Sequence, residues 1–307
     1  MPLHQLTCVT IGVPDVGAVA AYYAEFGLTD LGDGSLATID GGRQLRIAPA
    51  PTRRLIDLTV GVDDPDDLDR IGAGLAGIGL SAVREGDAVH AGEPVAGFLA
   101  NVEISPRVEQ PFAPPTPYNG PGRPERTEER APGVLRDEPV RPLRLGHVVV
   151  GSVDYAATSR FFIEGLGFKA SDYIKDAGVF LRCSTEHHNV LVVSSPVNFL
   201  HHTSWQVEDI DEIGRGACAM LERHPERHVW GLGRHYSGSS FFWYLKDPAG
   251  NFAEYYCDMD CIIDDQLWTP ETLDTAGSLL SWGPPLPPSF LQPDDLAELM
   301  AGSHSVA

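Results

Sequence analysis

The sequence predicts an α+β protein made of two similarly built domains that a proline-rich linker joins. Its 307 residues are enough for about two domains of ordinary size. Prolines crowd together between Phe112 and Pro142 without apolar periodicity, which is typical of a linker. The same order of elements recurs on both sides of it. We therefore predict a first domain at 1–112, a linker at 113–142, a second domain at 143–262 and a tail at 263–307.

Each predicted domain begins with an apolar strand and a short helix. The strands are Leu6–Val13 and Leu145–Val150, and a constant offset of 139 residues relates their first residues. The helices are Val16–Phe26 and Tyr155–Glu164, and a Gly-Leu pair follows each of them. Glycine directly after a helix supplies the usual left-handed stop. The two domains therefore start with the same strand and helix.

Each domain also repeats internally. The stretch Leu58–Asp64 resembles Ser204–Asp209, and each precedes an amphipathic helix, Pro65–Gly77 or Ile210–Arg223. The following strands are rich in Val, Phe, Tyr and Trp. We predict four strand-helix-strand-strand-strand (βαβββ) modules, two in each domain. The tail is expected to pack over the second domain and to contain one helix, Pro293–Met300.

Charge and cysteine content restrict the function classes. Lys and Arg total 22 against 43 for Asp and Glu, which gives a net charge of -21 and disfavours nucleic acid and anionic membranes as partners. The five cysteines are odd in number and contain no CxxC pair, which argues against a disulfide framework or a zinc ribbon. No apolar run resembles a signal peptide or a membrane span. We expect a cytoplasmic protein.

Glu254 is the first candidate for a metal ligand. Asp247–Gly250 has the composition of a turn, so Phe241–Lys246 and Asn251–Cys257 should pair as a hairpin. Alternation then places Glu254 between two aromatic residues on one face of the second arm. A buried carboxylate needs a partner, and a metal ion would supply one. The alternative is that Glu254 faces solvent or pairs with an arginine.

Two histidines in apolar strands complete a possible metal set. His147 lies in the first strand of the second domain, where a lone histidine is more often a core or edge residue than a ligand. His202 follows His201, and alternation places only one of the pair on the inner face without deciding which. Two neutral imidazoles and one carboxylate hold non-heme Fe(II) and leave coordination positions open. His147, His202 and Glu254 therefore point to oxygen chemistry.

Four segments resemble the signature of type I extradiol catechol dioxygenases of the 2,3-dihydroxybiphenyl dioxygenase kind. These segments are Leu145–His147, His201–Trp205, Gly233–His235 and Phe242–Glu254. The family belongs to the vicinal oxygen chelate (glyoxalase/bleomycin resistance) superfamily. The resemblance covers the second domain almost end to end and the first more loosely. It implies two vicinal oxygen chelate domains, each of paired βαβββ modules. The family's H-x-x-aromatic-x-V strand selects His202 as the second metal histidine, with His201 as the alternative.

The resemblance also implies roles for three further residues. His188, 14 residues before His202, matches the acid-base catalyst, and neighbouring His187 is the alternative. His235 and Tyr244 match groups that hydrogen-bond the substrate oxygens and bound dioxygen. Singly, a surface histidine pair, a loop histidine and a core tyrosine would explain them equally well. Their joint occurrence in order favours the site.

The activity implied by the resemblance is ring cleavage of a catechol beside a hydroxyl, with both atoms of O2 entering a muconic semialdehyde-type product. The implied cofactor is Fe(II), with Mn(II) as a substitute. The substrate is expected to be a biphenyl-type or other aryl catechol, and a homoprotocatechuate-type acid is the alternative. Trp205, Trp243, Phe180 and Phe199 suggest an aromatic-rich setting that core packing would also explain. Proximal and distal cleavage both stay open.

The first domain departs from the catalytic pattern. Cys8 stands where the second domain has His147, and the position that corresponds to His202 lies near Asp57. We expect no iron there, although Glu103 lies in the last strand of this domain. Family members use this domain in assembly, which implies a homo-oligomer.

Two other functions on the same fold compete with ring cleavage. A glyoxalase-like lyase would need a fourth metal ligand near Val190–Val193, and this stretch is apolar. A ligand-binding resistance protein would need neither the metal set nor the acid-base histidines. Both observations favour the dioxygenase.

Overall fold

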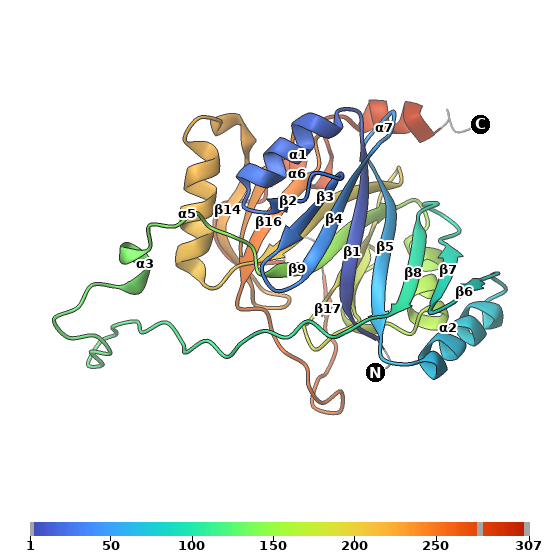
Figure 1. The fold of residues 1–307 in the computed structure, drawn as a ribbon, viewed down its shortest axis with the longest axis horizontal. Coiled ribbons are helices and arrows are strands. Elements are labelled where there is room, and N and C mark those ends of the chain that lie inside the picture. The colour runs from blue at the N-terminus through green and yellow to red at the C-terminus, as the bar shows by residue number, and fades with distance from the viewer. Residues whose placement is uncertain (1–2, 275–278, 304–307) are drawn as a thin grey trace.

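Two large mixed β-sheets and a few helices form the molecule, and its computed structural model describes residues 3–274 and 279–303 (Figure 1). The first sheet has the strand order β2-β3-β4-β1-β5-β8-β7-β6. Its first module comprises β1 (Leu3–Val13), α1 (Val16–Glu25), β2 (Thr29–Asp30), β3 (Ser35–Thr38) and β4 (Gly42–Pro49). Its second module comprises β5 (Arg54–Val62), α2 (Pro65–Gly77), β6 (Val83–Glu85), β7 (Ala88–Gly92) and β8 (Leu99–Ile104).

The second sheet has the order β17-β10-β11-β12-β9-β13-β16-β15-β14-β18. Its first module comprises β9 (Arg144–Ser152), α4 (Tyr155–Arg160), the π-helical turn η1 (Phe161–Gly165), β10 (Lys169–Ile174), β11 (Gly178–Arg182) and β12 (Val190–Ser194). Its second module comprises β13 (Phe199–Gln206), α5 (Ile210–Leu221), the 3-10 turn η2 (Pro225–Arg227), β14 (His228–His235), β15 (Phe241–Lys246) and β16 (Phe252–Cys257).

The four predicted βαβββ modules and the α+β class are confirmed. In each sheet the first strands of the two modules lie side by side and antiparallel, β1 with β5 and β9 with β13. The capping residues Asp15, Asp64, Asp154 and Asp209 accept a backbone N–H at the start of their helices, which explains where these helices begin. The predicted hairpin of β15 and β16 also forms.

The linker and the tail contain little regular structure. Between β8 and β9 the linker forms the short helix α3 (Pro132–Leu135), and part of it extends away from the body (Figure 1). The tail adds β17 (Thr272–Leu273) beside β10 and β18 (Leu280–Trp282) beside β14. It ends with α6 (Pro288–Leu291) and α7 (Leu296–Ser303). The exact domain boundaries stay a prediction.

The tail helix α7 begins three residues later than Pro293, where the sequence placed its start. The side chain of Asp295 is held outside the helix by Arg53 of the first sheet, through bonds of 2.6 and 2.9 Å. The chain therefore turns at Asp295 before it becomes helical.

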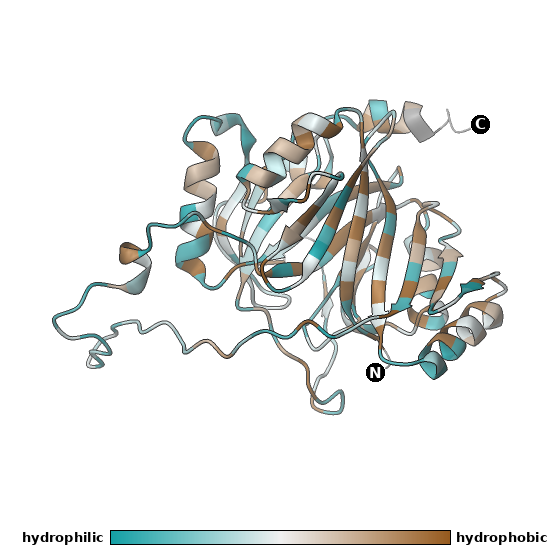
Figure 2. Cartoon of the chain, viewed as in Figure 1, coloured by the Kyte–Doolittle hydropathy of each residue, from teal (hydrophilic) through white to brown (hydrophobic). Residues whose placement is uncertain are grey.

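One hydrophobic core joins the two sheets. Hydrophobic residues form bands along the strands in Figure 2, and the outward surfaces of the helices are more hydrophilic. The Phe26 ring at the end of α1 stacks on Tyr255 of β16, with 3.8 Å between the ring centroids, and Tyr255 Oη donates a 2.6 Å hydrogen bond to the Phe26 carbonyl. Tyr23 Oη lies 3.1 Å from Thr203 Oγ1 of β13. The first module therefore packs on one face of strands β13 and β16.

The second contact between the sheets depends on a glycine. Helix α2 packs on η1, and a Cβ added at Gly74 would lie 2.6 Å from the carbonyl oxygen of Gly165. A side chain at this position would separate the two backbones.

No helix within the described ranges is long and apolar enough to cross a membrane.

The Tyr255 contact gives a stability prediction. The substitution Tyr255→Phe keeps the stacking on Phe26 but leaves the buried Phe26 carbonyl without its donor, so the free energy of unfolding should fall by about 1 to 3 kcal/mol. Urea unfolding followed by tryptophan fluorescence measures it. Tyr236→Phe is the control, because its hydroxyl bonds Glu271 at the exposed surface. Equal stability of the Tyr255 variant and the unaltered protein would contradict the contribution assigned to this bond.

Candidate metal centre

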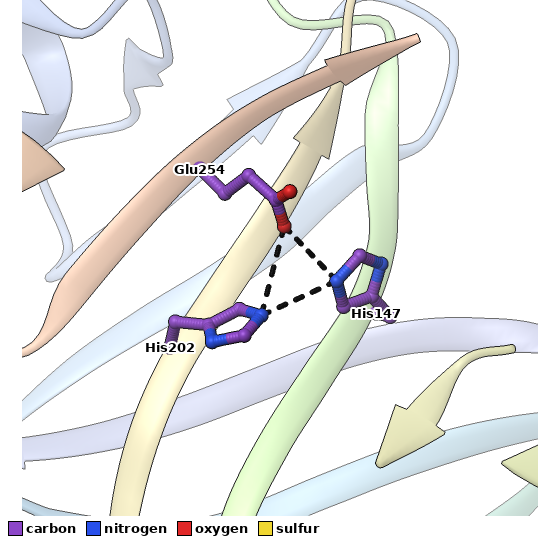
Figure 3. A group of neighbouring side chains, drawn as sticks. All are labelled: His147, His202 and Glu254. Atoms are coloured by element: carbon purple, nitrogen blue, oxygen red, sulfur yellow. Dashed lines mark hydrogen bonds and ion pairs between the residues drawn. The ribbon is translucent and has the colours of Figure 1, made fainter. Parts of the chain in front are cut away.

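The register of three neighbouring strands brings His147, His202 and Glu254 together. Ser204 of β13 pairs with His147 of β9 on one side and with Glu254 of β16 on the other. His202 lies two residues from Ser204, and alternate residues of a strand share a face. The three side chains therefore converge on one face of the second sheet (Figure 3). The opposite face packs against the first module through Tyr23 and Phe26.

The distances in this group match one small cation with ligands on adjacent coordination positions. Glu254 Oε2 lies 3.0 Å from His147 Nε2 and 3.6 Å from His202 Nε2, and the two imidazole nitrogens are 3.3 Å apart. Ligands about 2.1 Å from one ion stand about 3 Å apart when they subtend a right angle. The set therefore has the spacing of a facial triad that leaves other positions open.

The surroundings of Glu254 fit a cation as its partner. The residue is 0% exposed, and neither of its carboxylate oxygens accepts a well-formed hydrogen bond from any described donor. Burial acts to raise the pKa of Glu254, but neighbouring His147 and His235 bring that pKa below its usual value, so the carboxylate is charged. A buried charge without a partner is strongly unfavourable. A metal ion would neutralise it.

His202, and not His201, belongs to the triad. His201 points its Nε2 away from the group, to the Phe290 carbonyl at 2.5 Å, and its Nδ1 lies 2.7 Å from His202 Nδ1. A β-bulge between Leu200 and His202 interrupts the alternation of β13, so both histidines are buried. The geometry therefore places His202 in the group, as the family pattern implied. Strand alternation alone could not distinguish His202 from His201.

Of the neighbouring histidines His188 and His187, again only the second along the chain lies at the metal group. His188 lines the cavity at the metal group, and its ring centroid lies 4.3 Å from that of His147. His187 is buried behind it, with its Nε2 3.0 Å from an oxygen of the buried Asp172. Of the two, His188 is placed to meet a ligand of the metal.

His235 and Tyr244 lie on the other side of the group. His235 Nε2 is 3.0 Å from Tyr244 Oη and 3.8 Å from Glu254 Oε1. Burial lowers the pKa of His235 to about 4 and the pKa values of His188 and His202 well below 6.5. Burial also raises the pKa of Tyr244 well above 10. These imidazoles are therefore neutral near pH 7, and the phenol keeps its proton.

An apolar cavity of about 250 Å³ opens onto the metal group. Beside the site histidines and Tyr244, its walls are mainly aliphatic and aromatic. The apolar lining comprises Val149, Ile174, Ala177, Phe180, Leu191, Val193, Phe199, Leu279, Phe290 and Leu291. Phe180 and Phe199 lie here, as the sequence suggested, whereas Trp205 packs against Tyr23 of the first module and Trp243 bonds His228.

The tail contributes three cavity residues that the sequence analysis did not identify, Leu279, Phe290 and Leu291. The tail was expected to pack over the second domain, but no local pattern marks a contact with the metal group. Asp172, the partner of His187, was also missed. Its position in β10 is far in sequence from every motif, so only the tertiary structure reveals the pairing.

The corresponding part of the first sheet carries ordinary hydrogen bonds. Thr10 Oγ1 donates to Asp57 at 3.0 Å, and Thr7 Oγ1 donates to Glu103 at 3.2 Å. Cys8 is a half-buried free thiol, and burial raises its pKa to about 11. These acidic groups have protein donors, in contrast to Glu254.

Comparison with known proteins agrees with this geometry. Residues 144–255 match the model of the Glyoxalase/Bleomycin resistance protein/Dioxygenase superfamily. The second domain belongs to this superfamily. Metapyrocatechase 2 of Cupriavidus necator is 29% identical over 307 residues, which cover 94% of this chain and 92% of that protein.

Two solved structures with a similar fold are described as a metal-bound glyoxalase and a catechol dioxygenase. The Mn(II)-bound glyoxalase from Novosphingobium aromaticivorans has a TM-score of 0.73 at 23% identity, and the match covers 94% of each chain. BphC, described as a halotolerant catechol dioxygenase, has a TM-score of 0.71 at 20% identity, and the match covers 94% of this chain and 96% of that one. At these identities the likeness concerns the fold.

The carboxylate gives the sharpest test of the centre. Glu254→Gln replaces the only anionic ligand by a neutral amide, so Mn(II) affinity should fall by more than about 100-fold, beyond the usual effect of altering a residue behind the ligands. Titration of metal-free protein, with free Mn(II) followed by electron paramagnetic resonance, measures the affinity. Glu103→Gln makes the matched change in the first sheet and should bind as the unaltered protein does. Equal losses in both variants, or in neither, would contradict this site.

Proposed function

We propose that this protein is an extradiol dioxygenase that inserts both atoms of O2 into a catechol with an apolar, aryl-type substituent. The observation that carries the proposal is a facial His-His-Glu group whose two histidines line an apolar cavity, with a neutral histidine, His188, beside it. The similarity to a metapyrocatechase over most of both chains supports it.

The metal that fits the ligand set is Fe(II), with Mn(II) as the alternative, because imidazole and carboxylate ligands suit both ions. His147, His202 and Glu254 would hold it. Bound there, the ion would supply a local charge of about +1 for a catechol monoanion and redox chemistry with O2.

His188 would move the proton of a catechol hydroxyl. Its Nδ1 lies 3.1 Å from His187 Nδ1, so Nε2 is the nitrogen left to face the cavity. A neutral imidazole accepts a proton there and later returns it, which is the work of a general base and acid. The alternative residue, His187, would act from behind His188.

Tyr244 would stabilise negative charge on the substrate oxygens, and His235 would orient it. His235 Nδ1 faces the Leu279 carbonyl at 3.2 Å, which only accepts, so Nε2 of the neutral ring is an acceptor. Tyr244 keeps its proton because burial raises its pKa, so it remains a hydrogen-bond donor. Donors that are already fixed in a buried site act more strongly than donors in water. The 3.0 Å contact between the two side chains fixes their orientation relative to each other.

The cavity favours an apolar substituent over an acidic one. Among the described residues that line it there is no Lys or Arg, so the carboxylate of a homoprotocatechuate-type acid would have no cation to pair with. Val149, Ile174 and Leu191 instead offer an apolar wall. The catechol acid is therefore the second candidate.

The competing lyase function would need another ligand at the metal. Leu191 and Val193 of β12 line the cavity at the place expected for it, and neither side chain carries a ligand atom. The open positions suit a catechol and O2 instead. The likeness to a Mn(II)-bound glyoxalase concerns the fold, and the assay below tests this alternative directly.

We also propose that the protein works as a homo-oligomer in which the linker contacts a second copy. Phe112, directly before the linker, is 90% exposed, and Val134 and Leu135 of α3 in the linker are 68% and 61% exposed. The neighbouring pair Val134 and Leu135 presents exposed apolar surface on a segment that extends away from the body (Figure 1). A second copy would cover them.

The ring-cleavage proposal predicts oxygen uptake by reconstituted enzyme. Protein loaded anaerobically with Fe(II) is mixed with 2,3-dihydroxybiphenyl, catechol or homoprotocatechuate and then with 18O2. We expect a yellow product that carries two labelled atoms, with the highest kcat/KM for 2,3-dihydroxybiphenyl. Under the same conditions His188→Asn should lower kcat by about 100- to 10,000-fold with unchanged metal content.

The control variant is His90→Asn in the first sheet, which should behave as the unaltered enzyme. A preference for homoprotocatechuate would replace the substrate class proposed here. Absence of oxygen uptake with every catechol, together with turnover of a glutathione hemithioacetal, would establish the lyase instead.

The assembly proposal predicts that Phe112→Ser, Val134→Ser and Leu135→Ser together lower the molecular mass measured by light scattering after size exclusion. Ile263→Ser with Leu267→Ser is the control, because both side chains are 85% exposed on a different loop. A monomeric unaltered protein, or a triple variant of unchanged mass, would contradict the proposal.

A further inference from the structure

Two adjacent histidine pairs, His187-His188 and His201-His202, have the same arrangement. In each pair the Nδ1 atoms face each other, at 3.1 Å in the first and 2.7 Å in the second. The rings are steeply inclined, by 88° and 71°. The second histidine of each pair reaches the metal group, and the first lies behind it.

The partner behind His201 determines which nitrogen carries each hydrogen. Its Nε2 lies 2.5 Å from the Phe290 carbonyl, which only accepts hydrogen bonds, so Nε2 must carry a hydrogen. In a neutral His201 the Nδ1 lone pair is then free to accept. His202 must donate through Nδ1, which leaves the lone pair on its Nε2.

The metal group requires the same tautomer of His202, with the hydrogen on Nδ1 and the lone pair on Nε2. His202 Nε2 faces Glu254 and His147, so its lone pair would be given to the metal and its hydrogen would sit on Nδ1. The chain of donors from His202 through His201 to Phe290 is therefore consistent at every step. By contrast, His147 Nδ1 has no hydrogen-bond partner among the described residues.

We propose that His201 is a positioning residue for the metal centre, which fixes the tautomer and ring orientation of His202 against an anchor in the tail. Groups behind metal-bound histidines commonly have this effect on affinity. The inference rests on the metal centre of the proposed function but does not depend on ring cleavage.

The anchor itself is held firmly. Phe290 is buried in α6, stacks on Phe252 of β16 with an angle of 10° between the rings, and meets the Tyr244 ring edge-on. Its carbonyl therefore has a fixed position relative to the ligand strands.

Arg53 ties the tail to the same strand. This buried guanidinium donates to the Leu200 carbonyl, directly before His201, at 2.6 Å, and to Asp295 of the tail at 2.6 and 2.9 Å. Arg53, directly before β5, thus contacts both the strand that carries His201 and the tail that carries Phe290.

Mn(II) titration of the metal-free full-length protein tests the proposal. His201→Phe keeps a ring of similar size but neither accepts nor donates, so the affinity should fall by about 10- to 100-fold. His201→Gln retains an acceptor and a donor and should restore most of the affinity. The visible spectrum of bound Co(II) should change in the Phe variant and return in the Gln variant.

The matched control is His187→Gln, which alters the other histidine pair and should leave the Mn(II) affinity unchanged. If the Phe variant does not fold, as its melting temperature would show, His201→Asn replaces it, because the shorter amide cannot reach both partners. Unchanged affinity in the Phe or Asn variant, or equal loss in the Gln variant, would overturn the proposal. The titration uses neither catechol nor O2. If the His201 variants behave as expected but the protein cleaves no catechol ring, only the proposed function is overturned.

Discussion

The buried carboxylate of Glu254 is the constraint on which the rest of the structure depends. It lies in the middle of a sheet with no exposed surface, and none of the described residues places a donor well on it, so its charge needs a cation. The register that places Ser204 between His147 and Glu254 brings two imidazoles to the same point. The pleat of three strands thereby places two imidazoles where a metal ion could share them with the buried carboxylate.

The two faces of the ligand strands have separate tasks. On one face β13 and β16 present His202 and Glu254, and on the other Thr203 and Tyr255 pack against Tyr23 and Phe26 of the first module. The first sheet therefore supports the site without entering it. In the first sheet Asp57 and Glu103 bond threonines. The first module can still affect the positions of His202 and Glu254, because it packs on the strands that carry them.

The sequence predicted the repeated modules well because glycine stops, capping residues and apolar strands are local signals. The triad residues came from short motifs, and their convergence follows from strand register. The choice between His201 and His202 could not come from alternation, since a bulge at this point breaks the period of two. The roles of Phe290, Asp172 and Arg53 depend on contacts between residues far apart in the chain, which leave no local pattern.

The position of Phe290 has a consequence for how the protein is made. All three ligands precede it in the chain, so during synthesis from the N-terminus they emerge before the carbonyl that orients His202. A nascent chain therefore exposes the ligand strands while His202 is still free to rotate. His202 can therefore take its final orientation only once the tail has packed against the second sheet.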